Sequence, residues 1–183
     1  SIYTALYDWE IAEKDILEPI DDNIYNMAEK LLKEVLEFVN NNELEDISEN
    51  NIKLFQFIGT AGYITNLYGT GRPESGSEHI FAKEIERRIN IPHGISVSIG
   101  IIIMSIIQEQ YNNDVVKAIM KLRILDKGKK FNLNFKIITD VLKNIKPRED
   151  RYTIINEKFR INNIDEIMDK FENIIKENKV DLN

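Results

Sequence analysis

Apolar residues recur at intervals of three and four positions along almost the whole chain, which is the spacing of one face of an α-helix. Only four prolines and eight glycines interrupt this pattern in 183 residues. The pattern therefore predicts an all-α fold, a helical bundle around a hydrophobic core. Since 43% of the residues are hydrophobic, the chain can bury a sizeable core, and we expect residues 1–183 to form a single domain.

Capping residues, glycines and prolines between the apolar segments predict where the helices begin and end. Asp21 or Asp22, Ser48 and Asp114 are the candidate N-caps, because short polar side chains accept hydrogen bonds from the first free backbone N–H groups. The predicted helices occupy residues 2–18, 22–39, 49–68, 77–89, 94–107, 114–122, 135–145 and 164–176. The second helix is amphipathic, with Met27 on its inner face, and we expect it on the surface of the bundle.

The segment from Gly94 to Ile107 is apolar on nearly every side, which predicts a central helix surrounded by others. Gly100 and Ser105 interrupt its apolar run, and that run is too short to span a membrane, so we expect no membrane partner. No signal peptide is visible, and no cysteine is present for disulfides or thiolate ligands, so we expect a cytoplasmic protein. With a net charge of −7, we expect no nucleic-acid partner.

Both histidines of the chain, His79 and His93, lie 14 positions apart, each beside a helix start. Neutral imidazole is a good ligand for zinc and ferrous iron. The turn between the fourth and fifth helices is long enough to return His93 close to His79, which would place a metal site at the mouth of the bundle. The spacing equally allows two unrelated histidines, so it does not decide between the two interpretations.

Glycine and hydroxyl residues crowd the segment before His79, and a helix start presents free N–H groups to phosphate or carboxylate. Arg72 adds positive charge there. An ordinary capped turn explains the same residues. Arg148 and Arg151 precede the apolar residues Ile154 and Ile155, and as bare charges they are typical of solvated surface.

These segments together resemble one enzyme family. The motif Gly-Arg-Pro-Glu-Ser-Gly-Ser-Glu-His79, followed by His93-Gly94-x-x-Val97-x-x-Gly100, is similar to glycerol-1-phosphate dehydrogenase and its wider family of metal-dependent alcohol and glycerol dehydrogenases and 3-dehydroquinate synthase. The start of the chain, Ser1-x-Tyr3-Thr-Ala5-x-x-Asp8-Trp9, resembles the family's first helix after a metal-binding aspartate. The segment 151–155 resembles a late part of the family sequence.

The resemblance covers only the C-terminal helical half of the dehydroquinate synthase-like, iron-containing alcohol dehydrogenase fold. It implies that His79 and His93 bind Zn²⁺ or Fe²⁺, with a third ligand, an aspartate, expected a few residues before Ser1. The family's N-terminal domain, which binds NAD(P), has no counterpart here, so no residue of this chain is assigned to that cofactor. We therefore expect these 183 residues to be inactive alone, as the metal-binding part of an NAD(P)-dependent polyol or polyol-phosphate dehydrogenase in which the metal acts as a Lewis acid on the substrate carbonyl.

Further site residues are predicted on the same basis. We expect Arg72, Ser75 and Ser77 to bind phosphate or hydroxyl groups of a small-molecule polyol or polyol phosphate. Many relatives have a second histidine where this chain has Lys83, which is a candidate proton donor or an exposed helix lysine. They also have a glutamate where this chain has Ile95.

Two alternatives stay open: a sugar-phosphate cyclase of the 3-dehydroquinate synthase type, and a non-enzymatic helical remnant. The sequence leaves the substrate, the choice of metal and the oligomeric state undetermined, with a homo-oligomer through the helical domain as one option.

Overall fold

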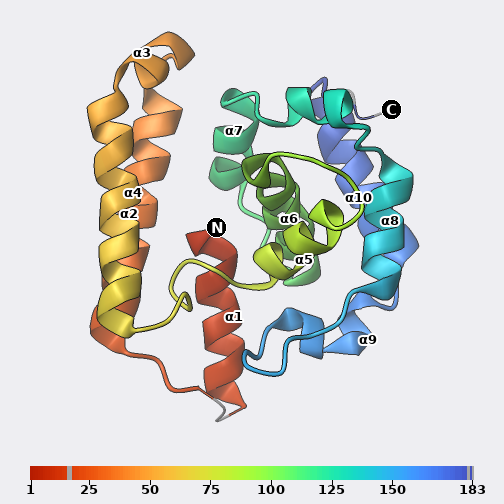
Figure 1. Ribbon diagram of the computed structural model, residues 1–183, viewed down its shortest axis with the longest axis horizontal. Helices are drawn as coiled ribbons and strands as arrows, with labels where there is room; N and C mark the ends of the chain where they lie inside the picture. Colours follow the sequence, from red (N-terminus) through yellow and green to blue (C-terminus); the bar gives the residue numbers. More distant parts are fainter. Residues whose placement is uncertain (16–17, 181, 183) are drawn as a thin grey trace.

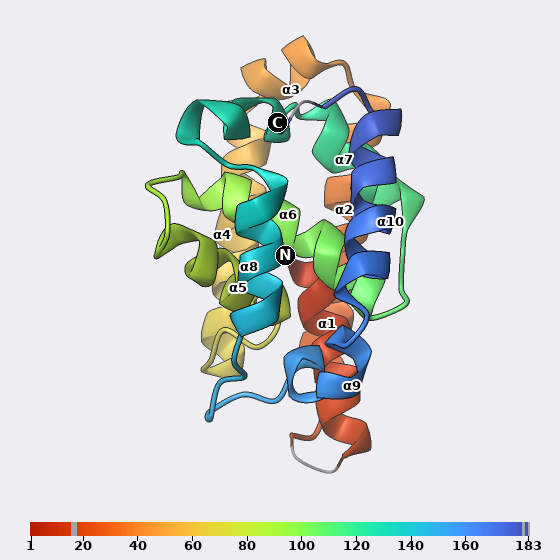
Figure 2. The same ribbon diagram turned by 90° about the vertical axis from the view of Figure 1, so that its right-hand side faces the viewer.

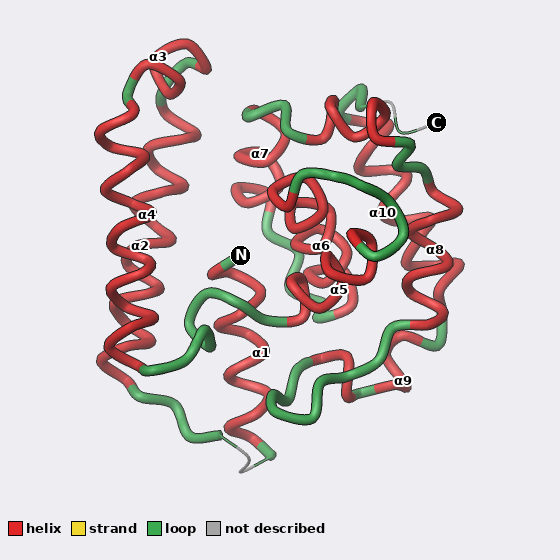
Figure 3. Tube along the Cα trace, viewed as in Figure 1, coloured by secondary structure: helices red, strands yellow, loops and turns green. Residues whose placement is uncertain are grey.

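The structure, a computed structural model, describes residues 1–15, 18–180 and 182. These residues form an all-α fold, as predicted, and their single β feature is an isolated bridge between Arg148 and Arg151 (Figure 3). The α-helices are α1 (Ile2–Lys14), α2 (Asp22–Asn41), α3 (Leu44–Glu49), α4 (Asn51–Tyr68), α5 (Ser77–Glu86), α6 (His93–Ile107), α7 (Asn113–Lys121), α8 (Phe135–Asn144), α9 (Lys158–Ile161) and α10 (Ile164–Glu177). Two short 3-10 helices are η1 (Leu125–Phe131) and η2 (Ile154–Asn156).

Helix α6 is the centre of the larger part of the fold, as its all-round apolar sequence predicts. It packs against α1, α5, α10 and η1, while α8 closes the outside against α5 and α10 (Figures 1 and 2). The closest packing is between α5 and α6, because Gly100 lets the two backbones touch. A Cβ atom added at Gly100 would lie 2.6 Å from the carbonyl oxygen of Glu78. This contact places the start of α5 directly against the middle of α6.

Helices α2 and α4 pack side by side and stand beside α1 (Figure 1). They share a second apolar cluster with α1, centred on Trp9, whose ring packs against those of Tyr25 and Tyr68 at centroid distances of 6.2 and 4.7 Å. The cluster also contains Phe57 and Ile64 of α4. The α2–α4 pair is attached to the rest of the fold through α1 at this cluster and through α7 at a smaller one that contains Val39 and Ala118.

Two predicted N-caps, Ser48 and Asp114, are wrong, because another residue caps the helix in each case. Ser48 lies inside α3, a helix that the pattern did not predict, and the cap of α4 is Asn50, whose side chain accepts from the N–H of Lys53. Asn112 rather than Asp114 caps α7, so Asp114 lies in the first turn. There its negative charge is favourable because the N-terminal end of a helix is positive.

The helix inner faces agree with the pattern in most places. Met27, predicted to face inward, is an exception with 36% of its surface exposed. Asp21 caps α2 as expected, and Gly69, with φ of 88°, ends α4 in the left-handed conformation that glycine adopts without strain. Among the helices that the structure describes, none combines the length and apolarity needed to cross a membrane.

Candidate metal centre

The two histidines meet where α5 and α6 begin. His79 is the third residue of α5 and His93 is the first residue of α6, and segment 87–92 joins the two helices. The centroids of the two imidazole rings are 5.2 Å apart, with 48° between the ring planes. The side chain of His79 is 22% exposed and that of His93 is 54% exposed, so the pair lies at the surface. The return of His93 towards His79, which the spacing allowed, does occur.

A carboxylate holds each ring by its Nδ1 atom. Glu78 Oε1 lies 2.7 Å from His79 Nδ1, and Glu86 Oε1 lies 2.7 Å from His93 Nδ1. Burial raises the pKa of Glu78, but the hydrogen bond with His79 and the other favourable contacts outweigh it, so the net pKa is lowered. Burial also raises the pKa of Glu86, but the hydrogen bonds that this carboxylate accepts from Ser96 and His93 outweigh it, so its net pKa is lowered as well. Both carboxylates are therefore ionised at neutral pH.

This arrangement determines the tautomers of the two rings. An ionised carboxylate only accepts hydrogen bonds, so each imidazole must carry a proton on Nδ1. In the neutral ring this leaves the lone pair of Nε2 free for a metal ion, as in many carboxylate–histidine–zinc sites. The second hydrogen bond of Glu86, from Ser96 Oγ, fixes that carboxylate in place. The two glutamates, which our sequence reasoning did not single out, thus orient both candidate ligands.

The distance between the rings fits two ligands of one ion. If Nε2 of each imidazole bonds zinc at about 2.1 Å, each ring centroid lies about 3.2 Å from the ion, and tetrahedral bonding separates the centroids by about 5 Å. The observed value is 5.2 Å. Within the described ranges 1–15, 18–180 and 182, however, no group of three or more His, Cys, Asp or Glu side chains could hold a metal ion. These residues supply two imidazoles, and further ligands would have to come from water or from outside them.

Arg72 lies completely buried behind this site. Its guanidinium donates to the carbonyl oxygens of Tyr152 at 2.8 Å and Asp8 at 3.3 Å, and its Nε forms an ion pair with Glu18 Oε2 at 3.0 Å. The guanidinium thus ties α1 to the segment before α9. Substrate binding by Arg72 stays a prediction.

The two predicted serines lie at the start of α5. Ser77 is buried, and its N–H donates to Asp8 Oδ2 at 2.5 Å. Ser75 is half-buried, and its carbonyl oxygen accepts from the guanidinium of Arg151. Lys83, one turn after His79, is exposed. The functions predicted for these residues stay predictions.

A buried acidic pair, Asp8 and Glu78, connects the site to α1. The two oxygens of Glu78 accept from Thr4 Oγ1 at 2.7 Å and from the N–H of Gly76 at 2.9 Å. Asp8 accepts from the N–H of Ile154 and from the side chain of Gln108. Burial and the charge of Glu78 raise the pKa of Asp8 to about 6, although its hydrogen bonds oppose this.

One sequence signal could have identified the two glutamates that orient the histidines. Glu78 is adjacent to His79, and Glu86 follows two helical turns later on the same helix face. Nothing in the sequence marked Asp8 as buried.

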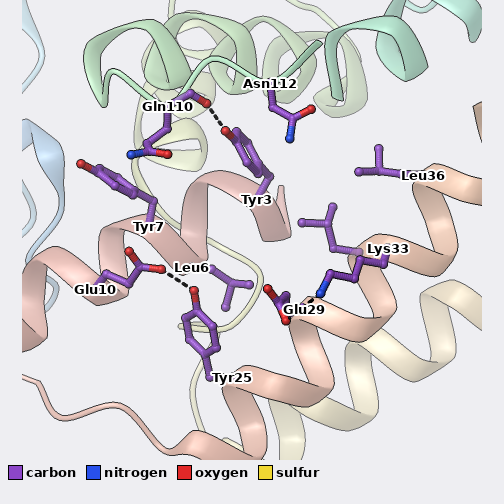
Figure 4. A pocket seen from close by; sticks show the side chains of 11 residues that line it. Tyr3, Leu6, Tyr7, Glu10, Tyr25, Glu29, Lys33, Leu36, Gln110 and Asn112 are labelled. Carbon is purple, nitrogen blue, oxygen red and sulfur yellow. Dashed lines mark hydrogen bonds and ion pairs between the residues drawn. The ribbon is translucent and has the colours of Figure 1, made fainter. Parts of the chain in front are cut away.

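A separate cavity of about 250 Å³ lies between α1, α2 and the segment that follows α6 (Figure 4). Tyrosine rings and acidic side chains line it, and the hydroxyl group of Tyr25 donates to Glu10. Neither histidine is among its lining residues. The cavity is therefore not part of the candidate metal centre.

The comparisons with known proteins agree with the motif. A Methanococcus aeolicus protein is 26% identical over 181 residues, covering 91% of this chain and 53% of that protein. A Sulfurisphaera tokodaii protein is 30% identical, covering 85% of this chain and 45% of its own length, and a Thermoplasma acidophilum protein is 27% identical, covering 84% and 44%. All three are named glycerol-1-phosphate dehydrogenase, with NAD(P)+ in the name. The chain resembles the glycerol-1-phosphate dehydrogenases. The resemblance inferred from the motifs is thereby confirmed, and no family model matches the chain.

The matches cover a much larger share of this chain than of the proteins that it matches. The chain spans about half the length of the glycerol-1-phosphate dehydrogenases that it matches, while the matches cover most of the chain itself. Together with the all-α fold, this is consistent with the C-terminal helical part of such an enzyme.

Proposed function

We propose that these 183 residues are the metal-binding helical domain of an NAD(P)-dependent polyol-phosphate dehydrogenase of the glycerol-1-phosphate dehydrogenase type. The observation that carries the proposal is the pair of imidazoles 5.2 Å apart, each held at Nδ1 by a glutamate, in a chain similar to enzymes of that name. Glu78 and Glu86 also accept hydrogen bonds from neighbouring groups, but packing does not require the two imidazoles to be held in one tautomer, whereas a metal centre does.

Each residue has a distinct part in this proposal. His79 and His93 would each offer Nε2 to Zn²⁺ or Fe²⁺, and Glu78 and Glu86 would keep the rings in the required tautomer. A bound metal of this kind supplies a Lewis acid that polarises a carbonyl group, such as that of a polyol-phosphate ketone, for hydride transfer from NAD(P)H. The assignment of Arg72, Ser75 and Ser77 to the substrate, and of Lys83 to proton transfer, completes the proposal.

A zinc titration followed by NMR tests the proposal, because the chain has only two histidines and hence two sets of imidazole signals. We expect added Zn²⁺ to shift both sets together, with one ion per chain. His79→Ala should abolish the shift of the remaining imidazole at the same zinc concentration. Glu78→Gln and Glu86→Gln should each weaken zinc binding by about tenfold to a hundredfold, because the charge that orients the ring is lost.

Lys83→Ala is the matched control, because it changes an exposed residue on α5 that the proposal does not place among the ligands. It should leave the zinc affinity unchanged. If the two imidazoles respond to zinc independently, or if His79→Ala leaves the response of His93 intact, the shared metal centre is refuted. Circular dichroism of each variant establishes that the helices are retained.

Activity belongs to the longer protein. The proposal predicts NAD(P)-dependent oxidation of a glycerol phosphate only when the nucleotide-binding half is present, and it places that enzyme in the cytoplasm. Hydride transfer by the isolated 183 residues would contradict this division of roles. Turnover of a heptulosonate phosphate instead of a glycerol phosphate would contradict the dehydrogenase assignment and favour the cyclase.

A further inference from the structure

The cavity between α1 and α2 is lined to a large extent by electron-rich groups (Figure 4). Three phenol rings and two carboxylates contribute to its wall, from Tyr3, Tyr7, Tyr25, Glu10 and Glu29. The three that come from α1 follow one another at intervals of four and three positions, and the two from α2 are four positions apart, so each set lies on one helix face. Two helix faces that meet here therefore supply these groups together.

Two of the three phenols donate their hydroxyl protons to the protein itself. Tyr25 donates to the carboxylate of Glu10, and Tyr3 donates to the backbone carbonyl oxygen of Gln110 (Figure 4). A phenol that has donated its proton can offer a ligand only the lone pairs of its oxygen and the negative face of its ring. These two tyrosines therefore favour a positively charged ligand in the cavity.

The charges around the cavity are not balanced. Its lining residues include two carboxylates but one ammonium group, that of Lys33, which pairs with Glu29 at 3.1 Å. Within the ranges 1–15, 18–180 and 182, Glu10 accepts the hydrogen bond from Tyr25 but has no ion-pair partner. Burial, the hydrogen bond to Glu10 and the charges of both glutamates raise the pKa of Tyr25, so both carboxylates act on this side of the cavity. A cation in the cavity would therefore lie next to a carboxylate that lacks a counter-charge.

Part of the wall is apolar, which favours an organic cation over a metal ion. Leu6, Leu32 and Leu36 line the cavity beside the tyrosines. A small metal ion needs several oxygen ligands, and no group of three or more His, Cys, Asp or Glu side chains in the described part of the chain could hold one. Alkyl groups around a charged nitrogen, by contrast, fit against leucine side chains and ring faces.

The volume of the cavity limits the size of its occupant. About 250 Å³ is available, and one water molecule takes a share of about 30 Å³ in the liquid. The occupant therefore has about eight non-hydrogen atoms. This is the size of a small metabolite, below the usual range of drug-sized ligands.

We infer that the cavity between α1 and α2 binds a small alkylated ammonium ion, whose nitrogen lies beside Glu10 and whose alkyl groups contact the surrounding phenol rings. The hydrogen bond from Tyr25 holds the carboxylate of Glu10 in one orientation for this ion pair. Attraction between the cation and the ring faces adds to the ion pair, and the leucines remove water from the alkyl groups. Neither histidine lines the cavity, so the inference goes beyond the proposed dehydrogenase function.

Choline is the probe for the test, because it is an alkylated ammonium ion of about the right size. Its matched neutral probe is 3,3-dimethyl-1-butanol, which has the same shape with a carbon atom in place of the charged nitrogen. The methyl proton signal of each probe is followed by NMR as the 183-residue chain is added. Protons over a ring face shift upfield, so the signal reports contact with the tyrosines. We expect a dissociation constant on the order of 1 mM for choline and one at least about tenfold higher for the alcohol.

Two substitutions separate the ion pair from the ring contacts. Glu10→Gln removes the charge but keeps an oxygen that accepts from Tyr25, so the dissociation constant of choline should rise about tenfold while that of the alcohol stays unchanged. Tyr7→Leu keeps an apolar side chain but removes a ring, so it should reduce the upfield shift and weaken choline binding about threefold.

Glu34→Gln is the matched control for Glu10→Gln. Glu34 is an exposed residue of α2 that does not line the cavity, and its substitution changes the net charge by the same amount. It should leave the dissociation constant of choline unchanged. Circular dichroism establishes that each variant keeps its helices.

The comparison of the two probes on the unsubstituted chain is decisive even if a variant fails to fold. Equal affinity for choline and the alcohol, no upfield shift with choline at about 50 mM, or equal effects of Glu10→Gln and Glu34→Gln would each overturn the inference. A preference for choline that Glu10→Gln removes and Glu34→Gln retains supports it. No zinc is added, so this result and that of the zinc titration are independent.

Discussion

The substitution Gly100→Ala probes the contact on which the candidate metal centre depends. Gly100 lies in the middle of α6, where a new Cβ atom would be 2.6 Å from the carbonyl oxygen of Glu78 and 3.1 Å from its Cα atom. Both are backbone atoms of α5, so no side-chain rotation can relieve the overlap. The start of α5 would have to move away from α6, and it carries His79 and the carboxylate that orients it.

The expected loss of stability follows from two opposing effects. Overpacking a close contact typically costs about 1–3 kcal/mol. Replacing glycine by alanine inside a helix returns about 0.5–1 kcal/mol, because the unfolded chain loses freedom. We therefore expect Gly100→Ala to lower the free energy of unfolding by about 1–2 kcal/mol. Gly94→Ala in the same helix is the matched control, since its Cβ atom would meet nothing within 4 Å, and it should be neutral or slightly stabilising.

Urea denaturation followed by circular dichroism measures the difference. We expect a lower midpoint for Gly100→Ala with an unchanged slope, because the amount of surface exposed on unfolding stays the same. NMR should also show a change in the imidazole signals of His79, which the Gly94→Ala control lacks. A Gly100→Ala protein as stable as the original, with unchanged imidazole signals, would refute the argument that backbone contact between α5 and α6 positions the site.

Two further predictions concern the buried charges behind the site. Because the pKa of Asp8 is raised from its ordinary value of 3.8 to about 6 in the folded protein, its contribution to stability is present below pH 4 and is lost as the pH rises through 6. The stability of the original protein relative to Asp8→Asn should therefore fall by up to about 3 kcal/mol between pH 4 and pH 7, and a difference that does not vary with pH would contradict this assignment. Arg72→Ala should cost about 2–4 kcal/mol in urea denaturation, because it removes the ion-pair partner of Glu18 and the donor to the buried carbonyl oxygen of Asp8. Arg87→Ala at an exposed site should cost less than about 0.5 kcal/mol. Equal effects of the two arginine substitutions would show that Arg72 is not a structural element.

Local sequence patterns were sufficient to predict most of the helices and the centre of the core. The 3.6-residue period located most of the helices, and the all-round apolar sequence of α6 identified the centre of the core, because burial demands such a sequence at every turn. The cap of α2 at Asp21 and the stop at Gly69 follow from backbone chemistry that acts within a few residues. The cap of α7 was misplaced because Asn112 and Asp114 are both good caps, and local preference does not rank them.

The sequence by itself determined that a metal ion could be bound only through histidine, carboxylate and water, because the chain has no cysteine, and that two imidazoles at most can contribute. Only the tertiary structure decided that these rings lie 5.2 Å apart and that Glu78 and Glu86 hold them. It also decided that Arg72 is buried and that one face of α4 is open. The physical reason is that helix periodicity acts over a few residues, whereas the distance between two side chains depends on how whole helices pack, here on a glycine that lets α5 touch α6.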